Sequence, residues 1–435
     1  MRKFLLLSLI TVLSFNYVIG QDVKDTKPEI KYRRSSLHTI LIESDKFPYK
    51  DTVISAYNNA PFPDKYNNHT IGEKSFNPYE FGDIKIDTTD TAAKADPTGK
   101  INYRPVIDNY FSQKKIANKL VAKWFNRQED GSFDMNLIGE RGSYNASEMQ
   151  ANIAKGSARG VSSLADAGVE LLGNTFVVVS KFNFVSNEIA ARIIRDIAKI
   201  AASRIPNGLL SKAASVGADV AYNKMKEGYS VWTTSYLYKL VWNDSIEAVF
   251  YNDLWMDKSS LNPAKKVAFD NSDLFKLEFV GDEKATGLVL FSLKEKRSED
   301  KIIAIATVRT IDAVYAKLQK AYDVFKPKVP LHTGEPITAK IGMKEGLEGG
   351  EKFEVFEQTQ DPKTGLTAYV SKGVIKVDKK LIWDNRYNAG DGPIIEADTT
   401  AVDSTAKAEP KPILDRTTFK GGKGFYSGML IKQLK

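Results

Sequence analysis

The sequence predicts an α+β protein, in which a central domain of layered helices and strands with an inserted helical hairpin is followed by a small all-β, barrel-like module. Two observations lead to this prediction. Amphipathic helical segments alternate with runs rich in β-branched residues between residues 111 and 328. After a stiff break at 326–330, short strand-like runs alternate with turns that contain glycine and proline. A chain of 435 residues has room for two or three domains of about 150 residues each.

The first 20 residues have the pattern of a secretory signal peptide. Two basic residues precede an apolar run over residues 4–13, and Val18 and Gly20 occupy the third-last and last positions before a cleavage site. The run is shorter than the roughly 20 residues that span a bilayer, and an uncleaved membrane anchor is the alternative. We therefore expect export and a mature chain that begins at Gln21. Cleavage removes two positive charges and no acid, so the formal net charge falls from +8 to +6.

Residues 21–110 are expected to form an extended N-terminal arm. Proline-containing segments such as Pro61-Phe62-Pro63 interrupt helices there, and aromatic residues are scattered between them. Two interpretations stay open: an arm that packs along another surface, and a loosely folded strap on its own domain. The polar residues 87–99 and 389–412 have the composition of a linker or a long exposed loop.

The central domain is predicted over residues 111–328. Two strands with a high content of β-branched or aromatic residues, 175–184 and 228–242, flank residues 187–226. That intervening segment has helical periodicity broken at 206–208, which predicts a helical hairpin. The other expected elements are helices at 112–125, 145–172 and 309–325, and strands at 133–138, 275–280, 287–293 and 301–307.

The C-terminal part is predicted to be a small barrel or sandwich. Residues 335–388 contain several short strand candidates separated by turns. Residues 389–412 would link this β module to a C-terminal strand segment at 413–435, which returns to it.

Composition excludes several kinds of chemistry. The chain has no cysteine, which removes disulfides, thiolate metal sites and cysteine nucleophiles. Its three histidines, His38, His69 and His332, have no metal-binding spacing. Phosphate loops and hydrolase elbows do not occur in the sequence. We therefore predict no catalytic residue, no cofactor and no metal site.

Catalysis by a carboxylate pair is the one enzymatic alternative. Such pairs in glycoside hydrolases are defined by their separation in space rather than in sequence. The candidates at predicted strand or helix ends are Glu140, Glu170, Asp244 and Asp253. Acids at such positions more commonly act as helix caps and surface charges.

An apolar stripe with helical spacing marks the first helix of the predicted hairpin. Ile189, Ile193, Ile197 and Ile200 belong to this stripe, and arginines and lysines occupy much of the other side. The stripe either faces a membrane surface or packs on the protein core.

A tripeptide pattern resembles the O-glycosylation acceptor of exported proteins of the Bacteroidota, in which aspartate precedes serine or threonine and then a small apolar, aliphatic or threonine residue. Four matches lie in the two predicted linkers, at Thr88, Thr91, Thr399 and Ser404. The resemblance implies that these four side chains are glycosylated. The glutamine expected just after the cleavage site is also similar to that found in exported proteins of this group.

The element order from the helix at 112–125 to the strand at 228–242 resembles the α+β domain of the curli secretion channel subunit and its periplasmic relatives. The resemblance covers about 130 residues and implies an envelope assembly or scaffold component. In that family the insertions form a membrane pore. Here the insertion is predicted to be helical, so pore formation is not carried over.

We therefore expect a non-enzymatic scaffold or assembly protein of the cell envelope, in the periplasm or associated with the outer membrane. It would bind another envelope protein or a surface polymer, with peripheral membrane contact and no nucleic acid, because the positive charge shows no concentrated patch. One face of the strand 228–242 is aromatic and is either a binding surface or core; it holds Trp232, Tyr236, Tyr238 and Trp242. The alternatives are an exported glycan hydrolase and a secretion substrate with a C-terminal sorting signal.

Overall fold

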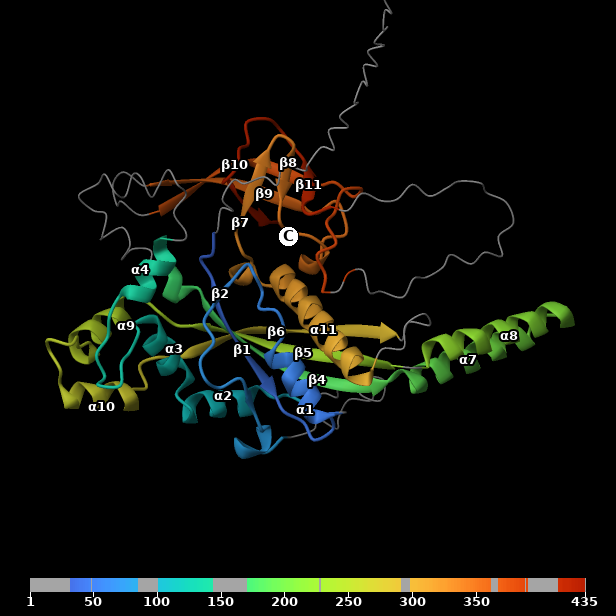
Figure 1. Ribbon diagram of the computed structural model, residues 1–435, viewed down its shortest axis with the longest axis horizontal. Coiled ribbons are helices and arrows are strands. Elements are labelled where there is room, and N and C mark those ends of the chain that lie inside the picture. The colour runs from blue at the N-terminus through green and yellow to red at the C-terminus, as the bar shows by residue number, and fades with distance from the viewer. Residues whose placement is uncertain are drawn as a thin grey trace, which may run out of the picture. The chain divides into compact units, whose positions relative to one another are not determined.

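A computed structural model describes residues 32–47, 49–84, 101–143, 170–226, 228–290, 298–360, 367–387, 389 and 414–434. The predicted signal peptide, the four predicted glycosylation sites and nearly all of the linker 389–412 lie outside these ranges. The α+β class is confirmed: a mixed sheet with helices on both faces carries an inserted helical hairpin, and the C-terminal half contains a closed barrel (Figure 1).

The central sheet has the strand order β2-β1-β4-β5-β6, and β3 also pairs with β1. Strand β1 is parallel to β2, β3 and β4, whereas β4, β5 and β6 are antiparallel neighbours. The bounds are β1 Ser36–Ile42, β2 Asn67–Asn68, β3 Ser75–Phe76, β4 Thr175–Ser186, β5 Gly228–Leu240 and β6 Leu277–Leu290.

Alternation along the strands divides the buried side chains between two layers of helices. Leu37, Phe176 and Val178 point to the face covered by α1 (Lys50–Asn58) and α11 (Glu299–Ala321). On the other face, residues of β1, β4 and β5 pack against α2 and α3; these are Ile40, Ile42, Val177, Val179, Tyr236 and Tyr238. Helix α2 spans Arg104–Gln113 and α3 spans Ile116–Trp124. The short helix η1, Pro78–Glu80, lies in the loop before α2.

An aromatic cluster lies beyond the end of β5. It joins α3 to α9 (Asp244–Val249), the π-helical turn η3 (Phe250–Leu254) and α10 (Pro263–Asn271). Helix α4 (Asn136–Ser143) supplies Ile138 to the same cluster.

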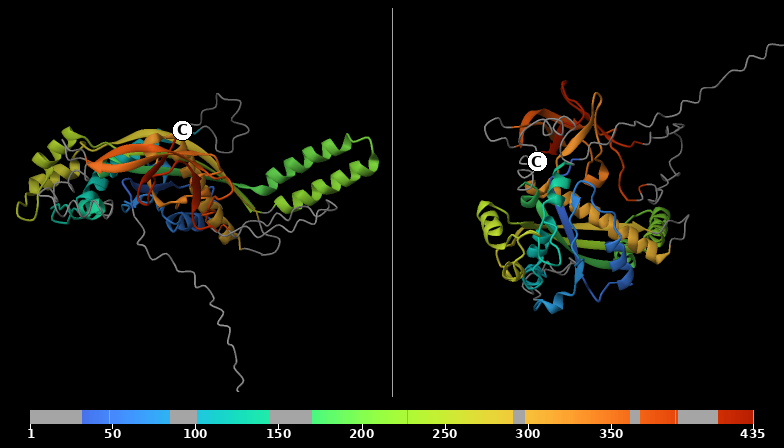
Figure 2. Two further views of the ribbon diagram at one scale, coloured as in Figure 1. Left: turned by 90° about the horizontal axis from the view of Figure 1, so that it is seen from above. Right: turned by 60° about the vertical axis from the view of Figure 1, so that its left-hand side comes forward.

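The hairpin consists of α7 (Asn187–Ser203) and α8 (Gly208–Met225), which lie side by side and extend beyond the ends of β4 and β5 (Figures 1 and 2). Each helix begins at a polar cap: the Ser186 hydroxyl accepts from the amide of Glu188, and the Asn207 side chain accepts from two amides of the first turn of α8. An ion pair between Lys199 Nζ and Asp219 Oδ1, 2.7 Å long, joins the two helices.

The described strands β7 to β12 close into an antiparallel barrel in the order β10-β11-β8-β7-β12-β9. Its interior is apolar and includes Leu331, Val355, Ile375 and Ile431. The bounds are η4 Asp323–Phe325, β7 Val329–Gly334, β8 Ile337–Ala339, η5 Met343–Glu345, β9 Lys352–Gln360, β10 Thr367–Val377, β11 Thr417–Lys420 and β12 Leu430–Gln433.

Several segments differ from the sequence-based expectations; for example, the strands expected at 275–280 and 287–293 are one strand, β6, and the expected arm contains helix α1. Residues 36–42, expected within the extended arm, form β1 in the interior of the sheet, because nearly all their side chains are buried between neighbouring strands and helices. Residues 301–307, expected as a strand, belong to α11, where Ile302, Ile305 and Ala306 follow a helical spacing against the sheet. Residues 136–138 of the strand expected at 133–138 begin α4.

Candidate functional site

The four predicted carboxylates do not share one element. Glu140 lies on α4, Asp244 is the first residue of α9, and Asp253 lies in η3. Glu170 pairs with Arg34 through Nε at 3.4 Å and accepts a hydrogen bond of 3.1 Å from the Tyr369 hydroxyl of β10. Glu170 is therefore the candidate that lies where the barrel contacts the sheet domain.

Two of the three histidines lie in the core and are held neutral. His69 Nε2 donates to the carbonyl of Leu120 at 2.9 Å, and its Nδ1 accepts from Arg141 Nη1 at 2.8 Å. Burial, together with the Arg141 charge, holds the pKa of His69 well below its usual range. Burial lowers the pKa of His38 to about 3. The third, His332, lies on β7 of the barrel.

The aromatic face of β5 is mainly core. Tyr236 and Tyr238 are buried against α2 and α3, and Trp242 packs against the aromatic cluster beyond the strand. Trp232 is half-buried. The placement favours the core alternative over a binding surface for this face.

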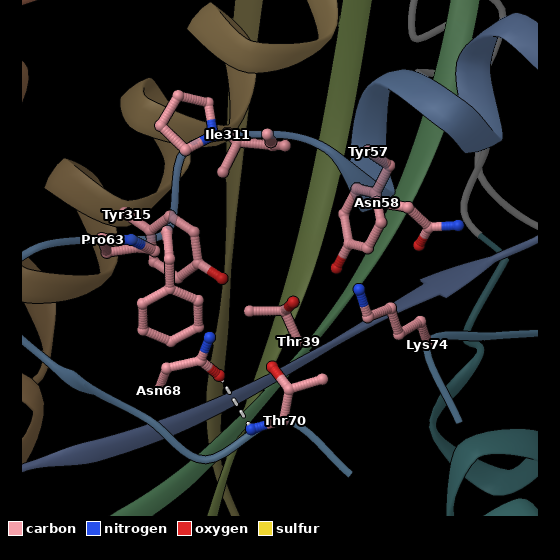
Figure 3. Close-up of a pocket in the computed structure, with 12 residues that line it drawn as sticks. Thr39, Tyr57, Asn58, Pro63, Asn68, Thr70, Lys74, Ile311 and Tyr315 are labelled. Carbon is pink, nitrogen blue, oxygen red and sulfur yellow. Dashed lines mark hydrogen bonds between the residues drawn. The ribbon is translucent and has the colours of Figure 1, made fainter. Parts of the chain in front are cut away.

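A cavity of about 110 Å³ lies between α1, α11 and β1 (Figure 3). Tyr57, Thr39, Lys74 and Tyr315 line it, and burial raises the pKa of the Tyr57 hydroxyl, which therefore stays neutral. The Tyr57 hydroxyl has no hydrogen-bond partner of good geometry among the described residues. Prolines, aromatic rings and polar groups form the walls of this small cavity. Lys74 is the only charged residue in the described part of its lining, so the cavity has no cluster of charged groups there.

The hairpin exposes large apolar side chains. Ile197 and Ile200 of the predicted stripe are 62% and 56% exposed, while Ile189 and Ile193 lie on α7 outside the described side chains. The most exposed is Leu209, at 80%, in the first turn of α8. Further exposed members are Leu210, Val216 and Val220. Sequence reasoning missed these residues of α8, although Leu209, Val216 and Val220 recur at i, i+7 and i+11 and so share one face of the helix.

Cations surround these apolar side chains. Residues 187–226 contain seven lysines and arginines and three acids. Several cations are paired within the hairpin, as Arg192 is with Glu188 at 2.6 Å. Arg204 and Lys212, on either side of the turn that carries Leu209, form no ion pair with other described residues and are exposed. The turn therefore combines apolar side chains with free positive charge. Within the described ranges, no helix has both the length and the apolar composition needed to cross a membrane.

A second cavity, of about 210 Å³, lies where the sheet domain meets the barrel; we call it the basic cavity. Its cations come from segments that are far apart in the sequence, and two carboxylates accompany them. The charged lining consists of Arg34, Lys65, Lys239, Lys326, Lys328 and Lys432, with Glu170 and Asp323.

Both carboxylates of the basic cavity are already engaged. Asp323 pairs with Lys432 at 2.7 Å and with Lys326 at 3.4 Å, and Glu170 pairs with Arg34. Lys239 and Lys328 form no ion pair within the described residues, and Lys328 Nζ lies 3.7 Å from the centre of the Tyr369 ring. Burial lowers the pKa of Lys328. The cavity thus holds more positive charge than its own acids balance.

Two tyrosines form one wall of the junction beside the cavity. The Tyr32 and Tyr369 hydroxyls lie 2.5 Å apart, and the Tyr369 hydroxyl donates to Glu170. Burial raises the pKa of Tyr32 to about 12, so both members of this pair stay protonated at neutral pH.

Of the basic cavity, sequence reasoning singled out only Glu170. Its lysines and arginine are spread from residue 34 to residue 432 and form no local pattern. Searches of protein-family models and of curated proteins find no match to this chain.

Proposed function

We propose that this chain is an exported, non-enzymatic scaffold or assembly protein of the cell envelope, which attaches peripherally to an anionic membrane surface through the helical hairpin. The carrying observation is that α7 and α8 extend beyond the sheet and expose apolar side chains among unpaired cations. The rest of the chain then binds another envelope protein or a surface polymer in the periplasm or at the outer membrane. The resemblance to the curli secretion channel family and the export pattern at residues 1–20 also support an envelope role.

The hydrophobic contribution comes mainly from the turn of the hairpin. Removing one leucine, isoleucine or valine side chain from water contributes about 1.5–3 kcal/mol. Leu209 and Leu210 are the strongest contributors, because they lie at the start of α8 and are largely exposed. An amphipathic helix with such a surface lies in the interface between lipid headgroups and acyl chains.

The electrostatic contribution selects the kind of lipid. The hairpin has a formal charge of +4 from residues 187–226. A lysine or arginine close to an anionic leaflet contributes about 1 kcal/mol of attraction, and salt screens it. Charge complementarity therefore favours an anionic lipid surface over a neutral one.

Co-sedimentation of the mature chain, residues 21–435, with lipid vesicles tests this proposal. We expect binding to phosphatidylcholine vesicles that contain phosphatidylglycerol, and much weaker binding to phosphatidylcholine alone or at high salt. The double variant Leu209→Ser, Leu210→Ser should lose at least about tenfold in affinity, because two exposed apolar anchors are removed.

A matched control replaces two exposed apolar residues far from the hairpin, Leu261→Ser with Val267→Ser in and beside α10. This control should bind vesicles as the wild type does. Equal binding to neutral and anionic vesicles, or full binding by the leucine variant, would refute the membrane attachment.

A further inference from the structure

We propose that the basic cavity is a binding site for a phosphate-type oxyanion, either inorganic phosphate or a phosphomonoester group. This inference goes beyond the proposed function and does not depend on the hairpin. It rests on the surplus of cations in the cavity and on the incomplete hydrogen bonding of a buried arginine.

Arg34 is the first observation. Its side chain is only 8% exposed, yet its Nε and Nη1 atoms have no hydrogen-bond partner of good geometry among the described residues. The nearby Glu170 carboxylate, 3.4 Å from Nε, supplies charge without a well-formed hydrogen bond. A buried guanidinium with free donors is costly, and its planar fork matches the oxygens of a phosphate.

The charge balance is the second observation. Six cations line the cavity against two carboxylates, and Asp323 is shared by Lys326 and Lys432. Lys65 pairs with Asp64 and Glu345 outside the lining, so the surplus rests on Lys239 and Lys328. Lys326 is nearly inaccessible, with a side chain 2% exposed. Cations in excess repel each other where they are buried or half-buried, and a dianion placed among them would reduce that penalty.

Lys328 and Lys239, which are unpaired among the described residues, mark the part of the cavity in which the anion would bind. Lys328 is held over the Tyr369 ring, and Lys239 enters from the end of β5. Both ammonium groups are unpaired within the described part of the chain, so they are available to the anion. Glu170 and Asp323 also line this space, but Glu170 pairs with Arg34, and Asp323 pairs with Lys326 and Lys432.

Size limits the class of ligand. A water molecule needs on the order of 10–15 Å³ of such space, so about 210 Å³ accommodates a phosphate group with a small substituent or several waters. A long polymer does not fit inside, although a phosphate at its end or side does.

Isothermal titration calorimetry of the mature chain tests the site, with chloride-balanced buffers at constant ionic strength. Inorganic phosphate should bind with saturation, and the variants Lys328→Gln and Lys239→Gln should each weaken binding roughly tenfold, because each removes one charged contact. The control Lys423→Gln changes an exposed lysine remote from the cavity lining and should leave the affinity unchanged.

Comparison of inorganic phosphate with sn-glycerol 3-phosphate separates the two sources. Tighter binding of the ester would point to a phosphorylated polymer or headgroup, and tighter binding of the free ion to phosphate itself. A heat signal that does not saturate, or one that is equal in Lys328→Gln, Lys239→Gln and Lys423→Gln, would overturn the proposal. Circular dichroism of each variant verifies that it is folded.

Discussion

Buried ionisable side chains give the sheet a pH-dependent stability. His38 lies on β1 and is fully inaccessible, and neither of its ring nitrogens forms a hydrogen bond of good geometry with the described residues. The neighbouring His69 is equally buried but bonded on both nitrogens, to Leu120 and Arg141. The two buried histidines therefore have opposite effects on stability. His38 is a buried polar group with unsatisfied hydrogen bonding, whereas His69 links two parts of the structure through its hydrogen bonds.

We predict that His38→Leu raises the free energy of unfolding by about 1 kcal/mol at neutral pH, because it removes an unpaired buried polar ring. The variant should also lose part of the acid sensitivity of the wild type. Unfolded histidine binds a proton near its ordinary pKa of about 6.5, whereas folded His38 resists protonation down to about 3. Its contribution is thus complete above about pH 6.5 and is lost as the pH falls toward about 3, on the order of 2–3 kcal/mol between about pH 7 and about pH 4.5.

Urea denaturation at these two pH values measures both effects. His69→Leu serves as the contrast, since it removes one acceptor of the buried Arg141 guanidinium and should destabilise the protein by about 1–3 kcal/mol. Equal pH dependence in the wild type and in His38→Leu would contradict the prediction.

At the level of elements, the aromatic cluster shows how helices without strong individual propensity are held in place. Phe250 is fully buried in η3, and its ring centre lies 4.5 Å from that of Phe125 and 5.4 Å from that of Phe133. Trp242, Trp255, Phe269 and Phe275 complete the shell around it. The cluster therefore connects β5, α3, η3 and α10.

We predict that Phe250→Ala lowers the free energy of unfolding by about 3–5 kcal/mol, because it leaves a cavity at the centre of the cluster. The adjacent Val249→Ala is the matched control, since Val249 is exposed and should change stability by less than about 0.5 kcal/mol. Chemical denaturation of both variants provides the comparison. A small loss for Phe250→Ala would mean that the cluster relaxes around the missing ring.

Sequence reasoning succeeded where a pattern is local. The hairpin and the long strand β5 each have a continuous period, and the break at Pro206 lies between α7 and α8. The prediction of a strand at 301–307 was wrong because tertiary packing, and not local propensity, determines the secondary structure there. Ile302, Ile303 and Ile305 are β-branched and favour a strand, yet they lie in α11, which packs its apolar face on the sheet. It also missed β1, whose polar members Ser36 and His38 are buried in the interior of the sheet.

The basic cavity could not be predicted from the sequence, because its residues come together only in the folded molecule. Arg34 precedes β1, Lys239 is the second-last residue of β5, and Lys432 lies on β12. These three residues are about 200 positions apart in the sequence, so no local pattern can link them. They come together only because the barrel contacts the sheet domain. Glu170 could be proposed as a candidate carboxylate, but its partners Arg34 and Tyr369 could not be identified.

The hairpin can be removed without breaking the sheet, because β4 and β5 pair continuously up to the pair Ser186 and Tyr229. We predict that replacing residues 187–228 by Asn-Gly yields a folded protein, since this dipeptide forms the two-residue turn that antiparallel strands favour. The variant should retain cooperative thermal unfolding, lose helical circular dichroism, and lose binding to anionic vesicles. Phosphate binding should persist, because no residue of the basic cavity lies in the hairpin. An unfolded product would show instead that α7 and α8 support the sheet, and loss of phosphate binding in a folded product would show that the hairpin and the cavity are coupled.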